Sequence, residues 1–285
     1  MTQRYQIIIA ALPVVAALVL LSPPAVVLTF LLFGDAHIFT AFLYQQRAGK
    51  IGAKYWRRFL VSVVGVGMFL FVTNASLPLF TLLTATVFVI HFLLDEIYLL
   101  QTRVEPLLFF AMAPVFLLYV VPLSDKLLGT SLGGYALIAS VGCAVVYLGG
   151  TLWRKSLSHG GFWMMVAGLI LAGIMFFDVP SEKLLATVIL FHYARWLVFY
   201  ADKYWTTPRF VPYVRNVILV QVIVVLLFLW YSSFAGVGHL LLSVLFTEVG
   251  LYTLTLLHIF TTSRGSDYQR LLRAFLPGVP ALPKQ

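Results

Sequence analysis

Four histidines of this chain lie within long apolar segments, where a polar side chain is unexpected. They are His37, His91, His192 and His258. Polar and charged groups are costly in the hydrocarbon of a membrane, so each one found there is a candidate functional residue. Neutral imidazole is a common ligand of iron, copper and zinc. We therefore predict that the four histidines are the ligands of a buried metal site.

Charged residues accompany two of these histidines at helical spacing. Asp95 follows His91 by four residues, and Arg195 follows His192 by three, so each pair shares one face of a helix. A metal-bound histidine usually donates its second ring N–H to a carboxylate. We expect Asp95 to orient His91 in this way, and we take Asp95 and Arg195 as the candidate catalytic residues. Further acids on the same segments are candidate supporting or alternative ligands: Asp35, Glu96 and Glu248.

Each of these residues also has a purely structural interpretation. A histidine in a membrane helix often forms a hydrogen bond to a neighbouring helix, and this alternative applies to all four. Glu248 is an alternative partner for Arg195. Glu96 points about 100° away from Asp95 and can reach the cytoplasmic rim of its helix instead of the site.

Aromatic residues make up 15% of the chain. Those near the ends of apolar segments are typical of the belts at membrane interfaces. Those close to the histidines are candidates for the lining of a cavity that holds a long apolar substrate. They are Phe39, Phe92, Tyr193 and Trp196.

The composition indicates a protein of the lipid bilayer. Hydrophobic residues make up 61% of the chain and charged residues 10%, against about 25% charged residues in ordinary globular proteins. The net charge of +9 does not indicate a nucleic-acid-binding protein, because the basic residues fall in short gaps between apolar segments. The single cysteine, Cys143, excludes a disulfide framework and a zinc site built from several thiolates.

Ten segments are long and apolar enough to cross a membrane as α-helices, with proline, glycine and polar residues at their borders. The predicted spans are 5–22, 25–44, 58–75, 77–101, 105–122, 133–152, 160–177, 181–202, 214–235 and 238–262. We therefore predict an all-α, polytopic membrane bundle in which residues 1–285 form a single transmembrane domain.

The basic residues fall almost wholly on one side of these spans, with Lys126 and Lys183 on the other. By the positive-inside rule that side is cytoplasmic, and an even number of spans puts both termini there. We expect a multi-pass protein of a bacterial inner membrane. The spans that carry the four histidines all run toward the cytoplasm, and the imidazoles fall in a layer roughly 8–15 Å below that surface at 1.5 Å per residue. The metal interpretation is favoured by this common depth.

The segments around the histidines read LFGDAHIFTAF, FVIHFLLDEIYLL, ILFHYARWLVFY and LTLLHIFTTSRG. In order and spacing they resemble the Brp/Blh family of bacterial membrane β-carotene 15,15'-dioxygenases. The matching positions are His37, His91 with Asp95, His192 with Arg195, and His258 with Arg264. The resemblance implies a multi-helix membrane protein that holds a non-haem iron between histidines and splits a carotenoid with dioxygen to give retinal.

Two departures from the family pattern affect the ligand set. Asp35 precedes His37, and the Pro-His-Gly setting of the family's first histidine is missing. Trp196 stands where the family has a second histidine, four residues after His192. The missing ligand is left to His258 or to a carboxylate.

The leading hypothesis is an enzyme: a membrane-embedded, dioxygenase-like oxygenase with non-haem iron. Its partners would be dioxygen and a lipophilic substrate, such as a carotenoid or another isoprenoid, that reaches the site laterally from the lipid. A di-iron hydroxylase or desaturase is a variant in which Asp95, Glu96 or Glu248 bridges two ions. The rival is a proton-coupled transporter or lipid-handling protein, in which buried histidines and carboxylates relay protons and bind no metal.

Overall fold

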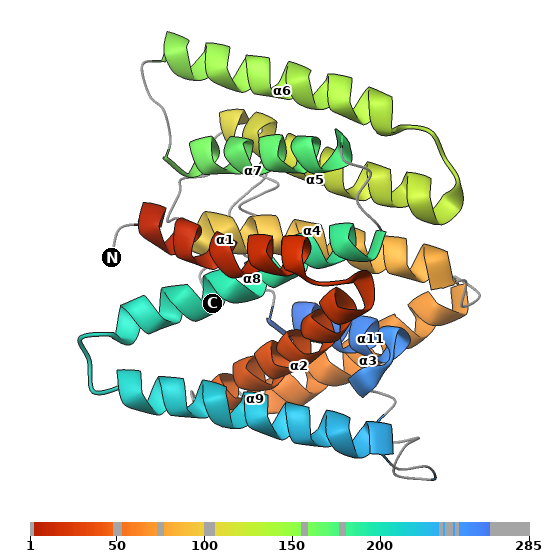
Figure 1. The fold of residues 1–285 in the computed structure, drawn as a ribbon, viewed down its shortest axis with the longest axis vertical. Coiled ribbons are helices and arrows are strands. Elements are labelled where there is room, and N and C mark those ends of the chain that lie inside the picture. The colour runs from red at the N-terminus through yellow and green to blue at the C-terminus, as the bar shows by residue number, and fades with distance from the viewer. Residues whose placement is uncertain are drawn as a thin grey trace. The chain divides into compact units, whose positions relative to one another are not determined.

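The computed structural model describes residues 3–47, 53–72, 77–99, 106–154, 159–176, 181–233, 236, 242 and 245–262. Within these ranges the regular secondary structure is α-helical throughout, as Figure 1 shows. The helices are α1 (Gln3–Leu20), α2 (Pro23–Arg47), α3 (Ala53–Val72), α4 (Leu77–Leu99), α5 (Pro106–Leu128), α6 (Gly133–Trp153), α7 (His159–Phe176), α8 (Ser181–Tyr204), α9 (Phe210–Ser233) and α11 (Glu248–Thr262). Each of the ten predicted segments coincides with one of them, so the all-α prediction is confirmed for the described residues.

The last helix begins later than the predicted residue 238. Residues 245 and 246 are helical, but the chain bends at Thr247, and α11 begins at Glu248. The side-chain oxygen of Thr247 accepts a hydrogen bond from the backbone N–H of Gly250 at 3.1 Å, and its carbonyl accepts one from Leu251 at 2.9 Å. This is the pattern of a threonine N-cap, which provides acceptors for amides that would otherwise be unpaired in lipid.

Five helices are long and apolar enough to cross a membrane by length and composition: α2, α4, α5, α6 and α9. Shorter apolar stretches lie in α1, α7 and α11. These helices indicate an integral membrane protein that associates with a lipid bilayer. In α8, the polar side chains His192 and Arg195 are buried rather than exposed.

Contacts divide the chain into two compact units, with the boundary inside α4. The first unit is Met1–Thr84 with Leu185–Thr261, and the second is Ala85–Leu184 with Thr262–Gln285. The first therefore contains α1, α2, α3, most of α8, α9 and nearly all of α11, and the second contains α5, α6 and α7. That residues 1–285 form one transmembrane domain stays a prediction.

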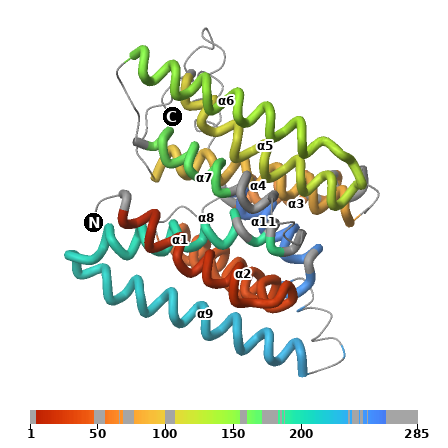
Figure 2. Tube along the Cα trace, turned by 45° about the horizontal axis from the view of Figure 1, so that its top comes forward, coloured from red at the N-terminus to blue at the C-terminus, as the bar shows by residue number. Residues whose placement is uncertain are grey.

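In the second unit, α5 packs against both α6 and α7, and α5 and α6 run side by side in Figure 2. Glycines allow this close approach. A Cβ added at Gly150 of α6 would lie 2.6 Å from Cδ2 of Leu107, and one added at Gly168 of α7 would lie 2.8 Å from Cβ of Pro114. Small residues at helix contacts are typical of membrane proteins, where dispersion contacts rather than the exclusion of water hold helices together.

The connection from α5 to α6 is held by the carboxylate of Asp125. Its Oδ1 accepts hydrogen bonds from the hydroxyl of Thr130 at 2.5 Å and from the amide of Leu132 at 2.9 Å, and its Oδ2 accepts one from the amide of Gly133 at 2.7 Å. Gly129, with φ of 69°, supplies the left-handed residue that ends α5. One charged side chain thus provides acceptors for the first amides of α6.

In the first unit, α2 and α9 are antiparallel neighbours. Two side-chain amides of α9 reach α2: Asn216 donates to the hydroxyl of Tyr44 at 3.4 Å, and Gln221 donates to the carbonyl of Leu32 at 3.4 Å. The higher-numbered residue of α9 meets the lower-numbered residue of α2, which fixes the antiparallel sense. A cluster of apolar side chains fills the rest of this contact, with Ala36, Val224 and Phe246 at its centre.

Helix α8 is joined to three neighbours in the same unit. Gln6 of α1 donates from Nε2 to Oδ2 of Asp202 at 2.8 Å. The hydroxyl of Tyr213 in α9 donates to the carbonyl of Leu197 at 3.3 Å. The third neighbour of α8 is α2, which it contacts through candidate site residues such as His192 and His37. These contacts fix the position of α8, which carries four of the candidate site residues.

We expect Gly168→Ala to lower the thermal unfolding midpoint of the detergent-purified protein, because the new Cβ overlaps a proline ring that cannot rotate away. Overpacking of this kind costs about 1–3 kcal/mol. Gly142→Ala in α6 is the matched control: nothing lies within 4 Å of its added Cβ, and alanine favours the helix. Equal midpoints for the two variants would contradict the close α5 to α7 contact.

Candidate metal centre

Three of the four predicted histidines lie together in the first unit, on three different helices. The ring of His37 on α2 lies 5.5 Å from the ring of His192 on α8 and 5.4 Å from the ring of His258 on α11, centroid to centroid. Both contacts are edge to face, at interplanar angles of 71° and 78°. His37 is therefore the central member of a three-histidine cluster, which consists of His37, His192 and His258.

The ring of Tyr193 on α8 stacks on the ring of His37. The ring centroids are 4.7 Å apart, and the interplanar angle is 27°. Tyr193 reaches this position because α2 has a glycine opposite it: a Cβ at Gly34 would lie 3.1 Å from the Tyr193 hydroxyl and 3.4 Å from Cδ1 of Leu251. Gly34 thus brings α2 close to both α8 and α11, the helices that carry the other two histidines.

Two members of the cluster, His192 and His258, are buried in the protein, and His37 is half-buried. The exposed fractions are 1% for His192 and 7% for His258. Two charged residues beside the cluster along the chain are also fully buried: Arg195, one turn after His192, and Asp35, two residues before His37. Neither carboxylate oxygen of Asp35 has a hydrogen-bond partner among the described residues. Such burial of polar groups is costly unless they are paired or bind a ligand.

The spacing of the rings is compatible with a shared metal ion. Imidazole nitrogens bind first-row metals at about 2.1 Å, which puts the centroids of two rings on one ion roughly 5 Å apart. The two measured separations are close to this value, and they are also those of imidazoles in simple edge contact. The donor set, imidazole with carboxylates nearby and no thiolate, suits iron, copper or zinc rather than calcium or magnesium.

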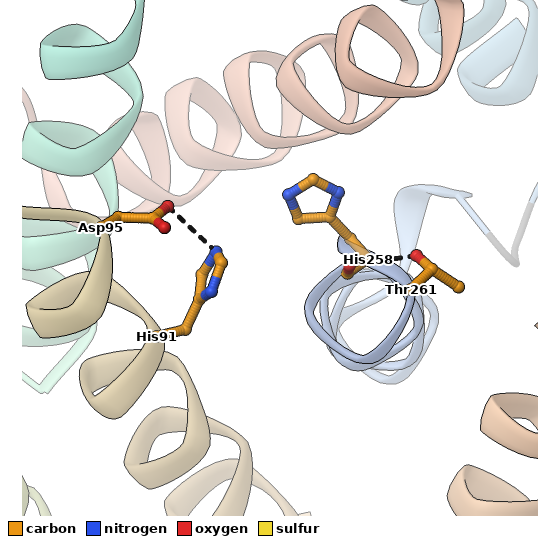
Figure 3. Close-up of polar contacts among 4 residues, drawn as sticks. All are labelled: His91, Asp95, His258 and Thr261. Carbon is orange, nitrogen blue, oxygen red and sulfur yellow. Dashed lines mark hydrogen bonds and ion pairs between the residues drawn. The ribbon is translucent and has the colours of Figure 1, made fainter. Parts of the chain in front are cut away.

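The fourth histidine, His91, forms a pair with Asp95 in the second unit. Nε2 of His91 lies 3.3 Å from Oδ2 of Asp95, one turn along α4, as Figure 3 shows. The side chain of His91 is 7% exposed and that of Asp95 21% exposed. This separation is within ion-pair range, and it places the Asp95 carboxylate beside one ring nitrogen of His91.

Figure 3 also shows the hydroxyl of Thr261, which donates to the carbonyl of His258 at 3.0 Å. The same hydroxyl donates to the carbonyl of Leu257 at 2.7 Å. Thr261 is therefore satisfied by its own helix. Its hydrogen bonds stabilise the last turn of α11, next to His258.

The remaining predicted residues lie in different surroundings. Glu96 is 3% exposed. Its side chain is therefore buried, in contrast to the alternative interpretation in which it reaches the aqueous rim of its helix. Phe39 packs in the α2 to α9 apolar cluster, and Phe92 is buried in the second unit. Trp196 stacks on Tyr200 at 5.2 Å and meets His192 edge-on at 6.4 Å. The side chain of Glu248, as well as Arg264, lies outside the described part of the chain.

Two residues near the cluster were missed by sequence reasoning. Gly34 carries no side-chain chemistry, and its role depends on which residue lies opposite. Gln221 is an uncharged residue within a long apolar run. A single amide in a membrane helix is the signal that could have identified it.

No protein-family model, no curated protein and no solved structure matches this sequence.

Substitution of Gly34 tests how the cluster is assembled. We expect Gly34→Leu to displace Tyr193 and thereby to release His37 from its stacking contact, at a cost of about 1–3 kcal/mol from overpacking. Thermal unfolding of the purified protein measures this cost. Gly67→Leu in α3 is the control, since no atom lies within 4 Å of its added Cβ. If both variants unfold at the wild-type midpoint, the approach of α2 to α8 is not as close as described.

Proposed function

We propose that this protein is a membrane-embedded, iron-dependent oxygenase that acts on a lipophilic substrate such as a carotenoid or another isoprenoid. The observation that carries the proposal is the three-histidine cluster, in which side chains from α2, α8 and α11 meet in a buried place. A histidine that only joins two helices needs one partner. His37 instead lies next to histidines of two other helices, and a cation bound by all three imidazoles would account for both contacts.

Iron fits the donor set best. Non-haem iron oxygenases bind their metal through histidines and a carboxylate and leave other coordination positions open. Cys143 is the only cysteine in the sequence, so a site built from several thiolates is excluded. A bound iron ion would supply open coordination positions at which dioxygen is activated. The apolar surroundings exclude water and favour a substrate that partitions into lipid.

The residues around the cluster take supporting roles in this proposal. Tyr193 fixes the plane of the His37 ring through stacking. Arg195 is a permanent, buried positive charge one turn from His192, where it stabilises negative charge that develops during oxygen transfer. We further propose that His91 is a fourth ligand, oriented by Asp95. In a di-iron variant, Asp95, Glu96 or Glu248 would bridge the two ions.

The membrane topology belongs to the same proposal. All ten helices cross the bilayer, both termini lie in the cytoplasm, and the membrane is a bacterial inner membrane. Support comes from the coincidence of each predicted span with a helix and from the basic residues on one side of the spans.

A relationship to the Brp/Blh family is proposed on the four histidine segments alone. Trp196 replaces that family's second histidine in the third segment, and its ring stacks on Tyr200. The ligand set proposed for this protein therefore draws on His258 in place of the missing histidine. Carotenoid cleavage to retinal is one reaction within the proposed class.

The iron content of the three-histidine variants tests the proposal. We expect the wild-type protein, expressed with iron and purified in detergent, to retain about one iron per chain, or two in the di-iron variant. His37→Ala, His192→Ala and His258→Ala each remove a ligand, and their iron content should fall at least about tenfold. Elemental analysis provides the measurement, with dioxygen uptake on addition of a carotenoid as the activity assay.

His159→Ala is the matched control, because His159 begins α7 in the second unit and should leave the iron content unchanged. A wild-type protein without a transition metal, or a His192→Ala variant with full iron, would overturn the oxygenase proposal. The transporter alternative predicts no bound metal in any of these proteins.

Separate variants test the fourth ligand. We expect His91→Ala to lower the iron content, and Asp95→Asn to weaken iron binding by about 10–100-fold, the usual effect of losing a carboxylate that orients a ligating histidine. Iron retention is measured during titration with a chelator. Full retention in His91→Ala would remove His91 from the ligand set and leave the three-histidine cluster as the site.

A further inference from the structure

Four tyrosines from three helices meet at one end of the first unit. The ring of Tyr213 on α9 lies 5.9 Å from the ring of Tyr44 on α2, centroid to centroid. The same ring lies 6.2 Å from Tyr200 and 5.6 Å from Tyr204, both on α8. Asn216 of α9 also donates a hydrogen bond to the hydroxyl of Tyr44 at 3.4 Å. Tyr44, Tyr200, Tyr204 and Tyr213 therefore form one tyrosine cluster.

Exposed cations accompany this cluster on all three helices. Each of them lies within four residues of a cluster tyrosine along the chain, and Nζ of Lys203 lies 5.6 Å from the ring centroid of Tyr200. The four cations form the basic patch, which consists of Arg47 at the end of α2, Lys203 on α8, Arg209 just before α9, and Arg215 on α9.

Carboxylates do not neutralise the basic patch. Residues 44–58 and 203–216 contain neither aspartate nor glutamate. Asp202 is the nearest acid on α8, and its Oδ2 accepts a hydrogen bond at 2.8 Å from Gln6, a residue that is 6% exposed. Among the described residues, none of the four cations forms an ion pair with a carboxylate. The patch therefore presents uncompensated positive charge to an anionic partner.

The basic patch lies where a membrane helix meets water. Helix α9 is apolar enough to cross a membrane and begins at Phe210, and α2, which ends at Arg47, is another such helix. Next to the start of α9, Trp205 is 67% exposed and Val211 is 72% exposed. Tryptophan and tyrosine are enriched at the interfaces of a bilayer, and long basic side chains extend there to the headgroups. The patch is therefore at the level of lipid headgroups.

The connection between α8 and α9 holds part of the patch in a fixed position, at the left of Figure 1. The amide and the hydroxyl of Thr207 both donate to the carbonyl of Tyr204, at 2.8 and 2.9 Å. The amide of Arg209 donates to the Thr207 hydroxyl oxygen at 3.3 Å, and the amide of Phe210 donates to the Thr207 carbonyl at 3.1 Å. Because the turn is already ordered, a ligand would lose little affinity to ordering it.

We propose that the basic patch binds the headgroup of an anionic phospholipid. Guanidinium groups match the geometry of phosphate oxygens, and lipid phosphate is the anion that the bilayer itself supplies at this depth. A zwitterionic headgroup is a poorer fit, because its cationic amine would be repelled by the four cations. The site stands independently of the metal centre and of the oxygenase proposal.

Lipid titration of the full-length protein in detergent tests this proposal. Native mass spectrometry measures the dissociation constants of phosphatidylglycerol and phosphatidylcholine with identical acyl chains. We expect the wild type to bind phosphatidylglycerol about tenfold more tightly, because each cation near the surface favours an anionic lipid. Arg209→Gln/Arg215→Gln should lose about tenfold in affinity for phosphatidylglycerol and keep its affinity for phosphatidylcholine.

The matched control is Lys126→Gln/Arg154→Gln, which removes two exposed cations at the ends of α5 and α6 in the second unit. Its preference for phosphatidylglycerol should equal that of the wild type. Arg209→Lys/Arg215→Lys keeps both charges and should keep most of the preference. Equal affinities of the wild type for the two lipids would overturn the proposal, as would an equal loss in the control and in Arg209→Gln/Arg215→Gln.

Two further measurements use the wild-type protein alone. The preference for phosphatidylglycerol should weaken as the salt concentration rises, because exposed charges are screened; a preference that does not change with salt contradicts a charged site. Inorganic phosphate should displace phosphatidylglycerol only weakly. If inorganic phosphate binds as tightly as the lipid, the ligand is a soluble anion and the assignment to a phospholipid is overturned. Iron content plays no part in these outcomes, so the oxygenase proposal stands or falls separately.

Discussion

The polar side chains of this protein depend on burial against other helices, because lipid offers them no hydrogen bonds. Helix α8 makes the consequence clear. It carries five charged residues as well as His192, and it lies among α1, α2 and α9, with partners such as Gln6 for Asp202 and the Tyr213 hydroxyl for the carbonyl of Leu197. Helix α8 thus needs neighbours on several sides, because its polar side chains would find no hydrogen-bond partners in lipid.

Close approach of helices makes that enclosure possible. Gly34 allows α2 to come near Tyr193 and Leu251, so that one glycine sets the distance from His37 to helices α8 and α11. In the second unit, Gly150 and Gly168 do the same for α6 and α7 against α5. Dispersion forces and short polar contacts stabilise such packing, and both are lost when a side chain separates the backbones. The geometry of the candidate site is therefore determined by a residue that has no side chain.

The sequence predicts the helices well, because runs of apolar residues bounded by proline and glycine are a strong signal. It fails at the start of α11, since an N-cap threonine within an apolar stretch does not change the hydropathy of that stretch. Thr247 begins α11 through local hydrogen bonds that only the structure reveals. Similarly, counting residues from the helix ends predicts a common depth for His37, His192 and His258, but not which of them is central. That depends on the rotation of each helix, which follows from packing at Gly34 and Tyr193.

The position of His37 connects the three-histidine cluster with a neighbouring pocket. His37 contacts His192 of α8 and His258 of α11, and it also lines a pocket of about 200 Å³ between α2, α8 and α9. Any ligand that reaches the cluster through the pocket meets His37 and Tyr193 before it meets His192 or His258. Residues that fix the His37 ring, such as Tyr193, therefore affect both the three-histidine cluster and the pocket. This coupling follows from one helix, α2, being shared by the cluster and the pocket.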